Sequence, residues 1–477
     1  MPELQKPSGD FLNSLKELLG PAGWREGDDT ARYLEDPRGY FRGQAAIIVL
    51  PVNVEEVSEM VKLCSAAHVG IIPYGGGTGL VGGQLSLEND HSVVLSLERM
   101  NKIRSVDIKN DSMLVEAGCV LADIQNAALD ENRLFPLSLA SEGSCRIGGN
   151  LATNAGGIQV IRYGNARDLC LGIEAVLPDG SIYHGLTPLR KDNTGYDLRH
   201  MLIGSEGTLG IITAASLKLF PNPQNTATAF CAIPSPSHAI SLLKFCREEM
   251  GETISAFELM CEQGMKVLAN HFPQEQDPFK GEYSWFALIE IAGSSGIKEK
   301  FETTLMSAFK HGFLLDSVIA SSSAQSQALW RLRELMADAN KLEEAFCSSD
   351  TSVPKAQVDQ FIEETDAALL ALNPGLRINK YGHMGDGNLH FNIFPPEGIG
   401  KAQFLSTNPT IQKDVRLVID QKTHQMNGSI SGEHGTGRLK RNELQRYGDS
   451  AKLAAMKSIK AALDPLGIMN PGAVFSD

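Results

Sequence analysis

The N-terminal half of the chain alternates between short apolar runs and segments with helical periodicity. Residues 45–52 form an apolar run that predicts a strand. Asn53 follows, with Glu56 three residues later, which is the pattern of a capping box at a helix start. Apolar residues then recur at helical spacing to about residue 67, namely Val54, Val57, Val61 and Cys64. The pattern therefore predicts a strand followed by a helix.

Further strand and helix patterns continue to the C-terminal end. Strands are predicted over residues 69–73, 92–97, 112–116, 172–177, 210–219 and 284–291, and helices over residues 237–250, 298–311 and 451–463. Repeated alternation of this kind favours an α+β or α/β class. Residues 221–228 are rich in Pro and Asn and have few apolar positions, so we expect a link there and a domain boundary at Phe220.

Composition and charge narrow the class of protein. The 477 residues are enough for two or three domains, and 42% apolar with 21% charged residues is typical of a globular chain. The net charge of −14 disfavours nucleic acid as a partner, because an acidic surface repels phosphates. No apolar run reaches the roughly 18 residues that a membrane-spanning helix needs. The N-terminal residues lack the pattern of a signal or transit peptide, so a cytoplasmic location is expected.

The eight cysteines are scattered and contain no C-x-x-C pair. This spacing argues against a zinc ribbon, an iron–sulfur cluster or a disulfide framework. We expect most of them to be buried thiols in a reducing compartment.

Glycine carries the first chemical signal, because the 46 glycines are clustered. Residues 77–82 satisfy the dinucleotide pattern G-x-G-x-x-G, but the following residues predict a loop and a strand instead of the required helix. A Rossmann site is therefore rejected. Consecutive glycines still allow backbone N–H groups to surround an anionic oxygen, which favours a phosphate-binding loop over a purely structural turn.

Two more glycine-rich stretches lie at residues 141–157 and 203–212. A glycine-rich surface loop is the simpler interpretation of the first stretch, although it is too long for one tight turn. Three such segments in one domain indicate a large anionic cofactor that is held by backbone groups and contains a diphosphate.

The residues 381–393 and 428–437 are candidates for a metal site. Leu389, Phe391 and Ile393 alternate with His390 and Asn392, which predicts a strand with one apolar and one polar face. A glycine-containing bend before this strand can bring His383 beside His390, and the second segment adds Glu433. Two imidazoles and a carboxylate suit Zn²⁺ or a non-haem Fe²⁺ triad. The simpler alternative is a pair of core histidines beside a solvated Glu.

Taken together, these segments resemble the flavin-dependent 2-hydroxyacid dehydrogenases of the vanillyl-alcohol oxidase type. This family includes D-lactate and D-2-hydroxyglutarate dehydrogenases, and the D-2-hydroxyglutarate branch is the more similar. The resemblance extends from about residue 38 to residue 472 and rests on five motifs in the family's order: PYGGGTGLVGG, GSCRIGGNLATNAGG, KDNTGYDLRHMLIGSEGTLGI, GHMGDGNLHFN and SGEHGTGRLKR.

The resemblance implies an α+β fold with three parts. Residues 1–219 would form an FAD-binding domain of the PCMH type. Residues 220–450 would form a substrate- and metal-binding domain with an antiparallel sheet and flanking helices. Residues 451–477 would be a helix and loop that return to the FAD domain.

The resemblance also assigns roles to residues that match the family's motifs. His434 matches the catalytic base, Arg333 and Asn392 match substrate-binding positions, and the metal ligands would be His383, His390 and Glu433. The positions that would hold FAD are Gly75, Gly76, Gly77, Thr78, Gly79, Gly143, Ser144, Gly148, Asn150, Thr153, Asn154, Gly157, Glu206, Ile212 and Asn470. No histidine or cysteine lies in the first glycine loop, where some relatives attach the flavin, so non-covalent FAD is expected.

Two positions depart from the pattern of enzymes acting on D-2-hydroxyglutarate. Those enzymes have a hydroxyl residue four positions after the arginine and a lysine before the D-x-S-x-P segment. This chain has Ala337 and Ser348 there. Both groups help to hold the distal carboxylate, so the departures favour a smaller or differently substituted hydroxy acid.

The implied reaction is oxidation of an (R)-2-hydroxy acid, resembling 2-hydroxyglutarate, malate or lactate, to the 2-oxo acid. The hydride would pass to FAD and the electrons to an external acceptor, either an electron-transfer flavoprotein or a quinone. The metal would be Zn²⁺, with Mn²⁺ or Fe²⁺ as alternatives. A homodimer is one expectation for the oligomeric state.

Three other functions are compatible with the residues alone. They are a metal-dependent hydrolase of a phosphorylated substrate, a non-catalytic flavin- or ligand-binding protein, and a hydroxyacid oxidase that uses O₂.

Overall fold

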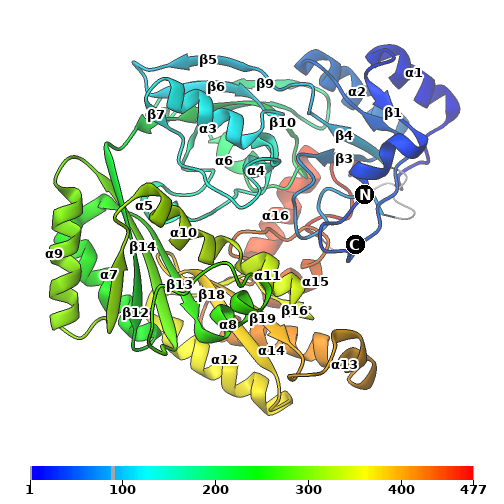
Figure 1. Cartoon of the computed structure of the whole chain (residues 1–477). Helices are drawn as coiled ribbons and strands as arrows, with labels where there is room; N and C mark the ends of the chain where they lie inside the picture. Colours follow the sequence, from blue (N-terminus) through cyan, green and yellow to red (C-terminus); the bar gives the residue numbers. More distant parts are fainter. Residues whose placement is uncertain (1–2, 88–91, 476–477) are drawn as a thin grey trace. The chain divides into compact units, whose positions relative to one another are not determined.

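The computed structural model describes residues 3–87 and 92–475, which form two compact units (Figure 1). Unit 1 combines Met1–Gly156, Gly164–Asn222 and Glu433–Asp477. Unit 2 combines Gly157–Tyr163 with Pro223–Gly432. The chain therefore builds most of unit 1, passes into unit 2 and returns to unit 1 at Glu433.

The N-terminal part of unit 1 is a small sheet of order β1-β2-β4-β3, in which β4 pairs in parallel with β2 and with β3. Its helices α1 and α2 share one apolar core with these strands. The elements are α1 (Gly9–Leu19), β1 (Trp24–Arg25), η1 (Gly27–Tyr33), β2 (Ile48–Val49), α2 (Val54–Ala67), β3 (Ile71–Tyr74) and β4 (Val93–Ser96).

Helix α2 begins as the sequence predicts. The side chain of Asn53 accepts a hydrogen bond from the backbone N–H of Glu56 at 2.7 Å. The Glu56 carboxylate in turn accepts from the backbone N–H of Val52 at 2.9 Å. These two hydrogen bonds satisfy N–H groups that have no partner inside the helix.

The second sheet of unit 1 is antiparallel and has the order β5-β6-β10-β8-β9. The strands are β5 (Ile103–Asp107), β6 (Ser112–Glu116), β8 (Cys170–Val176), β9 (Ile182–Gly185) and β10 (Ile211–Lys218), and β7 (Arg133–Leu134) pairs separately with β11 (Phe220–Pro221). The helices are α3 (Leu121–Asp130), α4 (Ile147–Ala152) and α6 (Leu198–Leu202), followed after the return of the chain by α15 (Arg441–Tyr447) and α16 (Ser450–Leu463).

Unit 2 is built on an eight-stranded sheet whose pairs are all antiparallel. The order is β15-β12-β14-β13-β18-β19-β16, and β17 also pairs with β19. The strands are β12 (Asn225–Ile233), β13 (Ile254–Cys261), β14 (Trp285–Gly293), β15 (Asp316–Ile319), β16 (Cys347–Ser348), β17 (Thr351–Ser352), β18 (Arg377–His383) and β19 (Asn388–Phe394).

Helices cover both faces of this sheet (Figure 1). One core lies under α7 (Pro236–Met250), α9 (Ile297–Lys310), α12 (Val358–Leu372) and α14 (Ile411–Gln425). The other core lies under α8 (Glu262–His271), α10 (Ser323–Glu334) and α11 (Met336–Leu342), and we call this side the α10 face. The remaining helices are α5 (Val160–Tyr163), η2 (Gly251–Thr253), η3 (Lys355–Gln357) and α13 (Lys401–Thr407).

Two general expectations from composition agree with the described part of the chain. All eight cysteines are buried thiols. Within residues 3–87 and 92–475, no helix combines the length and apolar character needed to cross a membrane.

The compact units extend unit 1 to Asn222 and differ more substantially from the predicted division at 219/220 and 450/451 in two other places. Residues 157–163 belong to unit 2, where the Arg162 guanidinium donates to the backbone carbonyl of Ala292 at 2.8 Å. The chain also returns to unit 1 at Glu433, before the predicted residue 451. Both differences depend on contacts between residues distant in sequence, which local patterning does not reveal.

One local prediction was wrong in detail, and one alternative for a glycine-rich stretch does not hold. The link predicted over residues 221–228 is shorter, because β12 already begins at Asn225. The glycine-rich stretch 141–157 is not all loop, because α4 forms within it at Ile147–Ala152. In both places the tertiary structure overrides weak local propensity.

A buried ion pair fixes the C-terminal loop of unit 1 to α16. Lys460 lies on the buried side of the helix, hydrogen-bonds to the Asp464 carboxylate, and donates to the carbonyls of Thr208 and Met469 at 2.8 Å each. Asp464 accepts from the backbone N–H of Ile468 and of Met469. Burial lowers the pKa of Lys460, and the Asp464 carboxylate opposes this shift.

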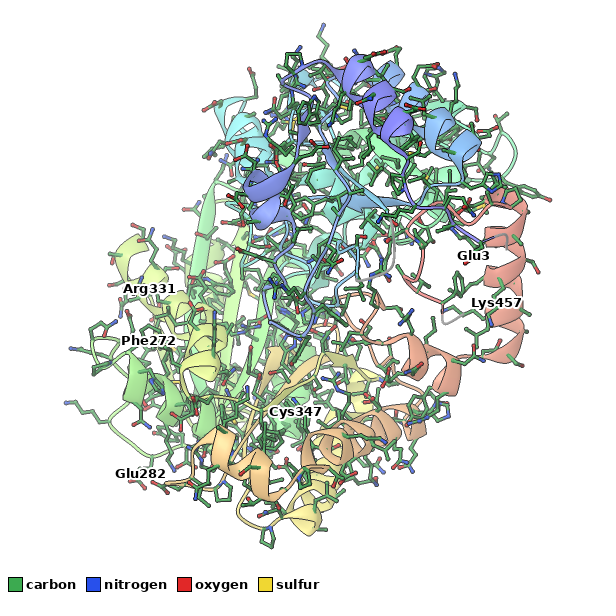
Figure 2. The ribbon with its side chains drawn as sticks, turned by 90° about the vertical axis from the view of Figure 1, so that its right-hand side faces the viewer. Glu3, Phe272, Glu282, Arg331, Cys347 and Lys457 are labelled. Carbon is green, nitrogen blue, oxygen red and sulfur yellow. The ribbon has the colours of Figure 1, made fainter. Side chains whose placement is uncertain are left out.

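We predict that Lys460→Met destabilises the protein by about 3–5 kcal/mol, because it leaves Asp464 buried without its cation. The measurement is the shift of the urea or thermal unfolding transition. The matched control is Lys457→Met on the exposed side of the same helix (Figure 2), for which we expect a change within about 0.5 kcal/mol. Equal effects of the two substitutions would contradict the role of the buried pair.

Candidate active site

Unit 1 contains a pocket that collects most of the glycine-rich segments. Eleven of the residues predicted to hold FAD line it: Gly75, Gly76, Gly77, Thr78, Gly79, Gly148, Asn150, Thr153, Glu206, Ile212 and Asn470. Gly143 and Ser144 line a neighbouring depression that shares Gly75, Gly76 and Gly77 with the pocket. Asn154 and Gly157 are outside both linings.

The pocket wall depends on glycine where two backbone segments approach closely. A Cβ atom on Gly76 would lie 2.2 Å from the backbone oxygen of Ser144, which no side chain can tolerate. Gly77 has a φ of +76°, a conformation that other residues rarely adopt. The loop 75–79 can therefore pack against the stretch at 144–149 only with these residues.

The polar groups of this pocket fit a large cofactor with its own donors. The side-chain oxygens of Asn150 and Asn470 are buried and have no hydrogen-bond partner among the described residues. Both residues line the pocket. The Asn470 amide nitrogen is already committed to the carbonyls of Gly83 and Glu206, at 3.0 and 2.7 Å. The two remaining acceptors can receive hydrogen bonds from a ligand such as FAD.

Glu206 holds the segment that follows Glu433. Its two carboxylate oxygens accept hydrogen bonds from the backbone N–H groups of Thr436 and Gly437, each at 2.7 Å. Burial raises the pKa of the Glu206 carboxyl, and the two backbone hydrogen bonds oppose this rise. Because His434 lies two residues before Thr436 and lines the pocket, this contact positions the predicted base.

In unit 2, the hairpin of β18 and β19 carries the predicted histidines. Tyr381 pairs with His390, and Asn379 pairs with Asn392. Leu389, Phe391 and Ile393 lie in the core under α7 and α12, so the predicted apolar side of this strand is confirmed. The other side of the hairpin belongs to the α10 face.

The turn between the strands brings His383 and His390 together, as the glycine-containing bend predicted. Their ring centroids are 5.8 Å apart and the ring planes are at 83°. Gly387 makes this turn with a φ of +85°, and a Cβ atom on it would lie 2.2 Å from the backbone oxygen of Val353. Glycine is therefore required at this position.

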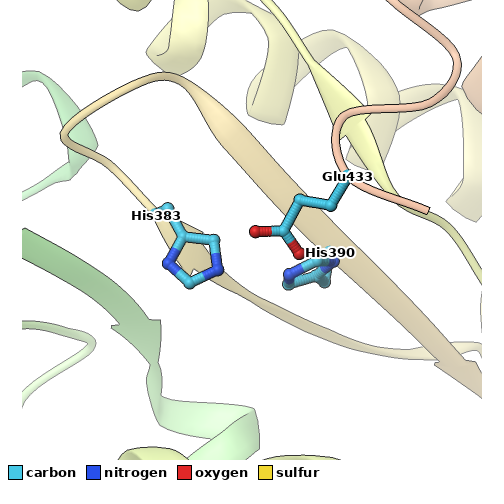
Figure 3. A group of neighbouring side chains, drawn as sticks. All are labelled: His383, His390 and Glu433. Carbon is cyan, nitrogen blue, oxygen red and sulfur yellow. The ribbon is translucent and has the colours of Figure 1, made fainter. Parts of the chain in front are cut away.

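Glu433 completes a group of three side chains that could hold a metal ion together with these histidines (Figure 3). It follows directly after Gly432, the last residue of unit 2. One ligand atom from each of His383, His390 and Glu433 lies within 4.8 Å of the others. The donor set of two nitrogens and one oxygen fits a Zn²⁺ site with a position left for substrate.

A fully buried carboxylate that the sequence analysis missed lies beside this group. Glu258, in the middle of β13, accepts from Nδ1 of His383 and from Nε of Arg333, each at 2.7 Å. The Arg333 guanidinium also lies 4.7 Å from the ring centre of Tyr381. The sequence contains one indication of this residue, because Glu258 is the only charged residue in the mostly apolar run 254–261. The pattern does not reveal the partners of its carboxylate.

Asn392 lies on the same face and is contacted by one of the two departing positions. The Ser348 hydroxyl donates to Oδ1 of Asn392 at 2.8 Å, and the Asn392 amide nitrogen is buried without a partner among the described residues. Asn379 donates to Oδ1 of Asn340 at 2.8 Å, and the Asn340 amide nitrogen is likewise buried and unsatisfied. Ala337, the other departing position, is exposed. The α10 face therefore offers neutral donors here.

We predict that Glu206→Gln destabilises unit 1 by about 1–3 kcal/mol, because the amide nitrogen faces a backbone N–H that has lost its acceptor. Flavin content after purification should fall as well, since Glu206 lines the pocket. Unfolding transitions and the ratio of flavin to protein absorbance measure both effects. Glu131→Gln, at an exposed carboxyl, is the control. Unchanged stability and flavin content in Glu206→Gln would contradict the positioning role.

Comparison with protein families gives two matches. Residues 45–185 match an FAD binding domain, and residues 222–474 match the C-terminal domain of FAD linked oxidases. Solved structures with the same fold include p-cresol methylhydroxylase, at a TM-score of 0.73 and 17% identity over 98% of both chains. Alkyldihydroxyacetonephosphate synthase also has a TM-score of 0.73, at 18% identity over 99% of this chain and 86% of that chain. The predicted PCMH-type fold is confirmed.

Curated relatives extend over almost the whole chain. The mitochondrial D-2-hydroxyglutarate dehydrogenase of Arabidopsis thaliana is 36% identical over 97% of this chain and 81% of its own length. The D-2-hydroxyglutarate dehydrogenase of Xanthomonas citri is 36% identical over 90% of this chain and 89% of its own length. The resemblance seen in the five motifs is confirmed. The chain therefore belongs to the family of FAD-linked oxidoreductases that includes the D-2-hydroxyglutarate dehydrogenases.

Proposed function

We propose that this protein oxidises an (R)-2-hydroxy acid to the corresponding 2-oxo acid with the help of FAD and a divalent metal. The observation that carries the proposal is the position of two consecutive residues. Glu433 belongs to the metal-binding group with His383 and His390, and His434 lines the pocket that fits FAD. One short segment therefore supplies both a metal ligand and a base.

The three donors His383, His390 and Glu433 would hold the metal, which we propose to be Zn²⁺, with Mn²⁺ or Fe²⁺ as alternatives. When bound, a divalent ion lowers the pKa of a coordinated hydroxyl group and so favours its deprotonation. The imidazoles must be neutral to act as ligands. Hydrogen bonding of His383 Nδ1 to Glu258 leaves Nε2 as the ligating atom.

His434 would accept the proton of the substrate hydroxyl. An imidazole is suited to this step because it titrates near neutrality. FAD, when bound, accepts the hydride from C2 of the substrate. Loss of the hydride from C2 and of the hydroxyl proton to His434 would leave a carbonyl at C2, and the two electrons would pass on to an external acceptor.

Arg333 would bind and orient the C1 carboxylate of the substrate. Among the described residues, its Nε donates to Glu258, which leaves the two terminal nitrogens of the guanidinium for a ligand. A guanidinium presents these nitrogens in a planar fork that matches a carboxylate. Asn392, on the same face, would contact the substrate through its unsatisfied amide nitrogen.

The substrate is proposed to have a smaller or uncharged group at its distal end. The curated relatives are named for D-2-hydroxyglutarate, which has a second carboxylate. In this chain Ser348 contacts Asn392, and the nearby donors of Asn340 and Asn392 are neutral amides. These neutral amide donors suit a neutral acceptor at the distal end of the substrate. A buried carboxylate there would require a stronger hydrogen bond from a charged donor.

Several finer expectations stay predictions. They are non-covalent attachment of FAD, an electron-transfer flavoprotein or a quinone as the acceptor, and a homodimer. A cytoplasmic location is also still a prediction, and the plant and animal relatives are named as mitochondrial proteins. A hydroxyacid oxidase would differ only in passing the electrons to O₂, which peroxide formation detects.

A metal-dependent hydrolase is the alternative from another class of enzyme. It would use the same histidines and Glu433, with the glycine loops holding a phosphorylated substrate. The match of residues 45–185 to an FAD binding domain favours the oxidoreductase. A purified protein without flavin absorbance would favour the hydrolase.

We predict that an (R)-2-hydroxy acid bleaches the flavin absorbance of the metal-loaded protein under anaerobic conditions. (R)-lactate, (R)-malate and (R)-2-hydroxyglutarate are compared by stopped-flow absorbance. Chelator-treated protein should retain its flavin and lose most of this reduction rate, and added Zn²⁺ or Mn²⁺ should restore it. Bleaching that is equal with and without metal would exclude the metal from the reaction, and no bleaching by any 2-hydroxy acid would exclude the proposed substrate class.

We predict that His434→Ala lowers the rate of flavin reduction by about 10²- to 10⁴-fold, because the proton of the substrate hydroxyl loses its acceptor. Flavin content and the unfolding temperature should change little. His184→Ala, at an exposed histidine of unit 1, is the matched control and should retain the full rate. A His434→Ala variant as fast as the unsubstituted protein would show that another group is the base.

A further inference from the structure

Glu258 is the most deeply buried carboxylate in the neighbourhood of the proposed metal and substrate groups. Its exposed fraction is 0%, and it lies in β13 among apolar residues of the sheet. A carboxylate in such a place is costly unless each of its oxygens is hydrogen-bonded and its charge is balanced. Glu258 meets both conditions through two residues from different elements, His383 of β18 and Arg333 of α10.

The contact with His383 fixes which ring nitrogen can bind a metal. Oε1 of Glu258 lies 2.7 Å from Nδ1 of His383. A carboxylate only accepts hydrogen bonds, so Nδ1 carries the proton and Nε2 carries the lone pair. Histidine ligands of metals are generally oriented by a carboxylate or a carbonyl in this way, and their basicity is increased by it.

The contact with Arg333 fixes the orientation of the guanidinium. Oε2 of Glu258 accepts from Nε at 2.7 Å, so the carboxylate uses the side edge of the arginine. The ring of Tyr381 lies against the guanidinium at 4.7 Å. An arginine that is held at its Nε and at one face of the guanidinium keeps its two terminal nitrogens available for an anion. Because the side chain is already ordered, it loses little conformational entropy when the anion binds.

The Arg333 guanidinium balances the charge of the Glu258 carboxylate. It contacts one carboxylate oxygen at 2.7 Å, and His383 donates to the other oxygen at the same distance. The carboxylate also partly neutralises Arg333, so an anionic substrate does not meet an uncompensated buried cation.

We propose that Glu258 is a positioning residue that fixes the metal-binding tautomer of His383 and the carboxylate-binding orientation of Arg333 at the same time. This inference rests on the proposed function, because it assumes that His383 binds a metal and that Arg333 binds the substrate. It goes further by making the two binding events depend on one side chain that touches neither metal nor substrate.

A half-buried carboxylate on the neighbouring strand has hydrogen bonds of a purely structural kind. Glu290 of β14 accepts from the Ser255 hydroxyl at 3.0 Å and from the Trp330 indole nitrogen at 2.9 Å. Neither partner belongs to the proposed metal or substrate groups. A glutamine can replace this carboxylate, since its oxygen can accept from Trp330 and its amide nitrogen can donate to Ser255. Both partners of Glu258 donate hydrogen bonds, so a glutamine there leaves one of them facing another donor.

The test compares Glu258→Gln and Glu258→Asp with Glu290→Gln as the matched control. Glu258→Asp retains the charge but withdraws the carboxylate by one methylene, so it remains informative if Glu258→Gln does not fold. Zn²⁺ affinity is measured by competition with a chromophoric chelator on flavin-loaded protein. Binding of oxalate, a non-reacting dicarboxylate, is measured from the change of the flavin spectrum in metal-free protein.

We expect both Glu258 variants to weaken Zn²⁺ binding by about 10- to 100-fold. Oxalate binding to metal-free protein should also weaken, because Arg333 loses its fixed orientation. Glu290→Gln should match the unsubstituted protein in both measurements. A merely structural role of Glu258 would lower the unfolding temperature and leave both affinities of the folded protein unchanged.

The possible failures are distinguishable. If the unsubstituted protein binds no Zn²⁺, the metal part of the proposed function falls and this inference falls with it. If the unsubstituted protein binds Zn²⁺ and reduces its flavin with a 2-hydroxy acid, but a folded Glu258 variant binds Zn²⁺ and oxalate equally well, only the inference is overturned. Loss of one affinity without the other would also overturn it, because the two roles are proposed to be coupled.

Discussion

The register between β18 and β19 is the constraint on which the candidate metal and substrate groups depend. It pairs Tyr381 with His390, and the alternation of side chains then places His383, His390 and Asn392 on the α10 face. A slip by one residue would exchange the histidine for Phe391 and would bury polar groups in an apolar core. The opposite side of the hairpin is packed under α7, α12 and α14, so the hydrophobic core itself prevents the slip.

In unit 1, the pocket depends on the close approach of two backbone segments, as the candidate metal and substrate groups of unit 2 depend on strand register. The loop 75–79 can meet the stretch at 144–149 because Gly76 has no side chain. Glu206 then fixes the returning segment through two backbone N–H groups. The pocket is thus lined by glycine-rich main chain together with a few polar side chains, among them His434.

Most of the candidate functional residues are linked to one another, either as neighbours in the chain or through hydrogen bonds. Glu433 and His434 are neighbours in the chain. Glu433 belongs to the candidate metal group, and His434 lines the pocket of unit 1. Glu258 links His383 to Arg333 inside the sheet. This coupling explains why Glu258 and Arg333 can both be buried, since each is the ionic partner of the other and the ring of Tyr381 lies against the guanidinium.

The sequence alone determined much of what is local. The capping box at Asn53, the strand at 388–394 with its polar side, and the glycine segments that line the pocket all follow from short-range rules. It also determined the family, because five ordered motifs are far more specific than any single one. The return of the chain at Glu433 and the short helix α4 were decided by tertiary structure.

Tertiary structure alone also revealed Glu258. A glutamate within an apolar strand pattern can face solvent, a cation or a histidine. The pairing of β13 with β18 brings His383 to this carboxylate, and the packing of α10 over the sheet brings Arg333 to it. The physical reason is that hydrophobic periodicity is encoded over a few neighbouring residues. The partners of a buried charge, here 75 and 125 residues away, are fixed only when the whole sheet has formed.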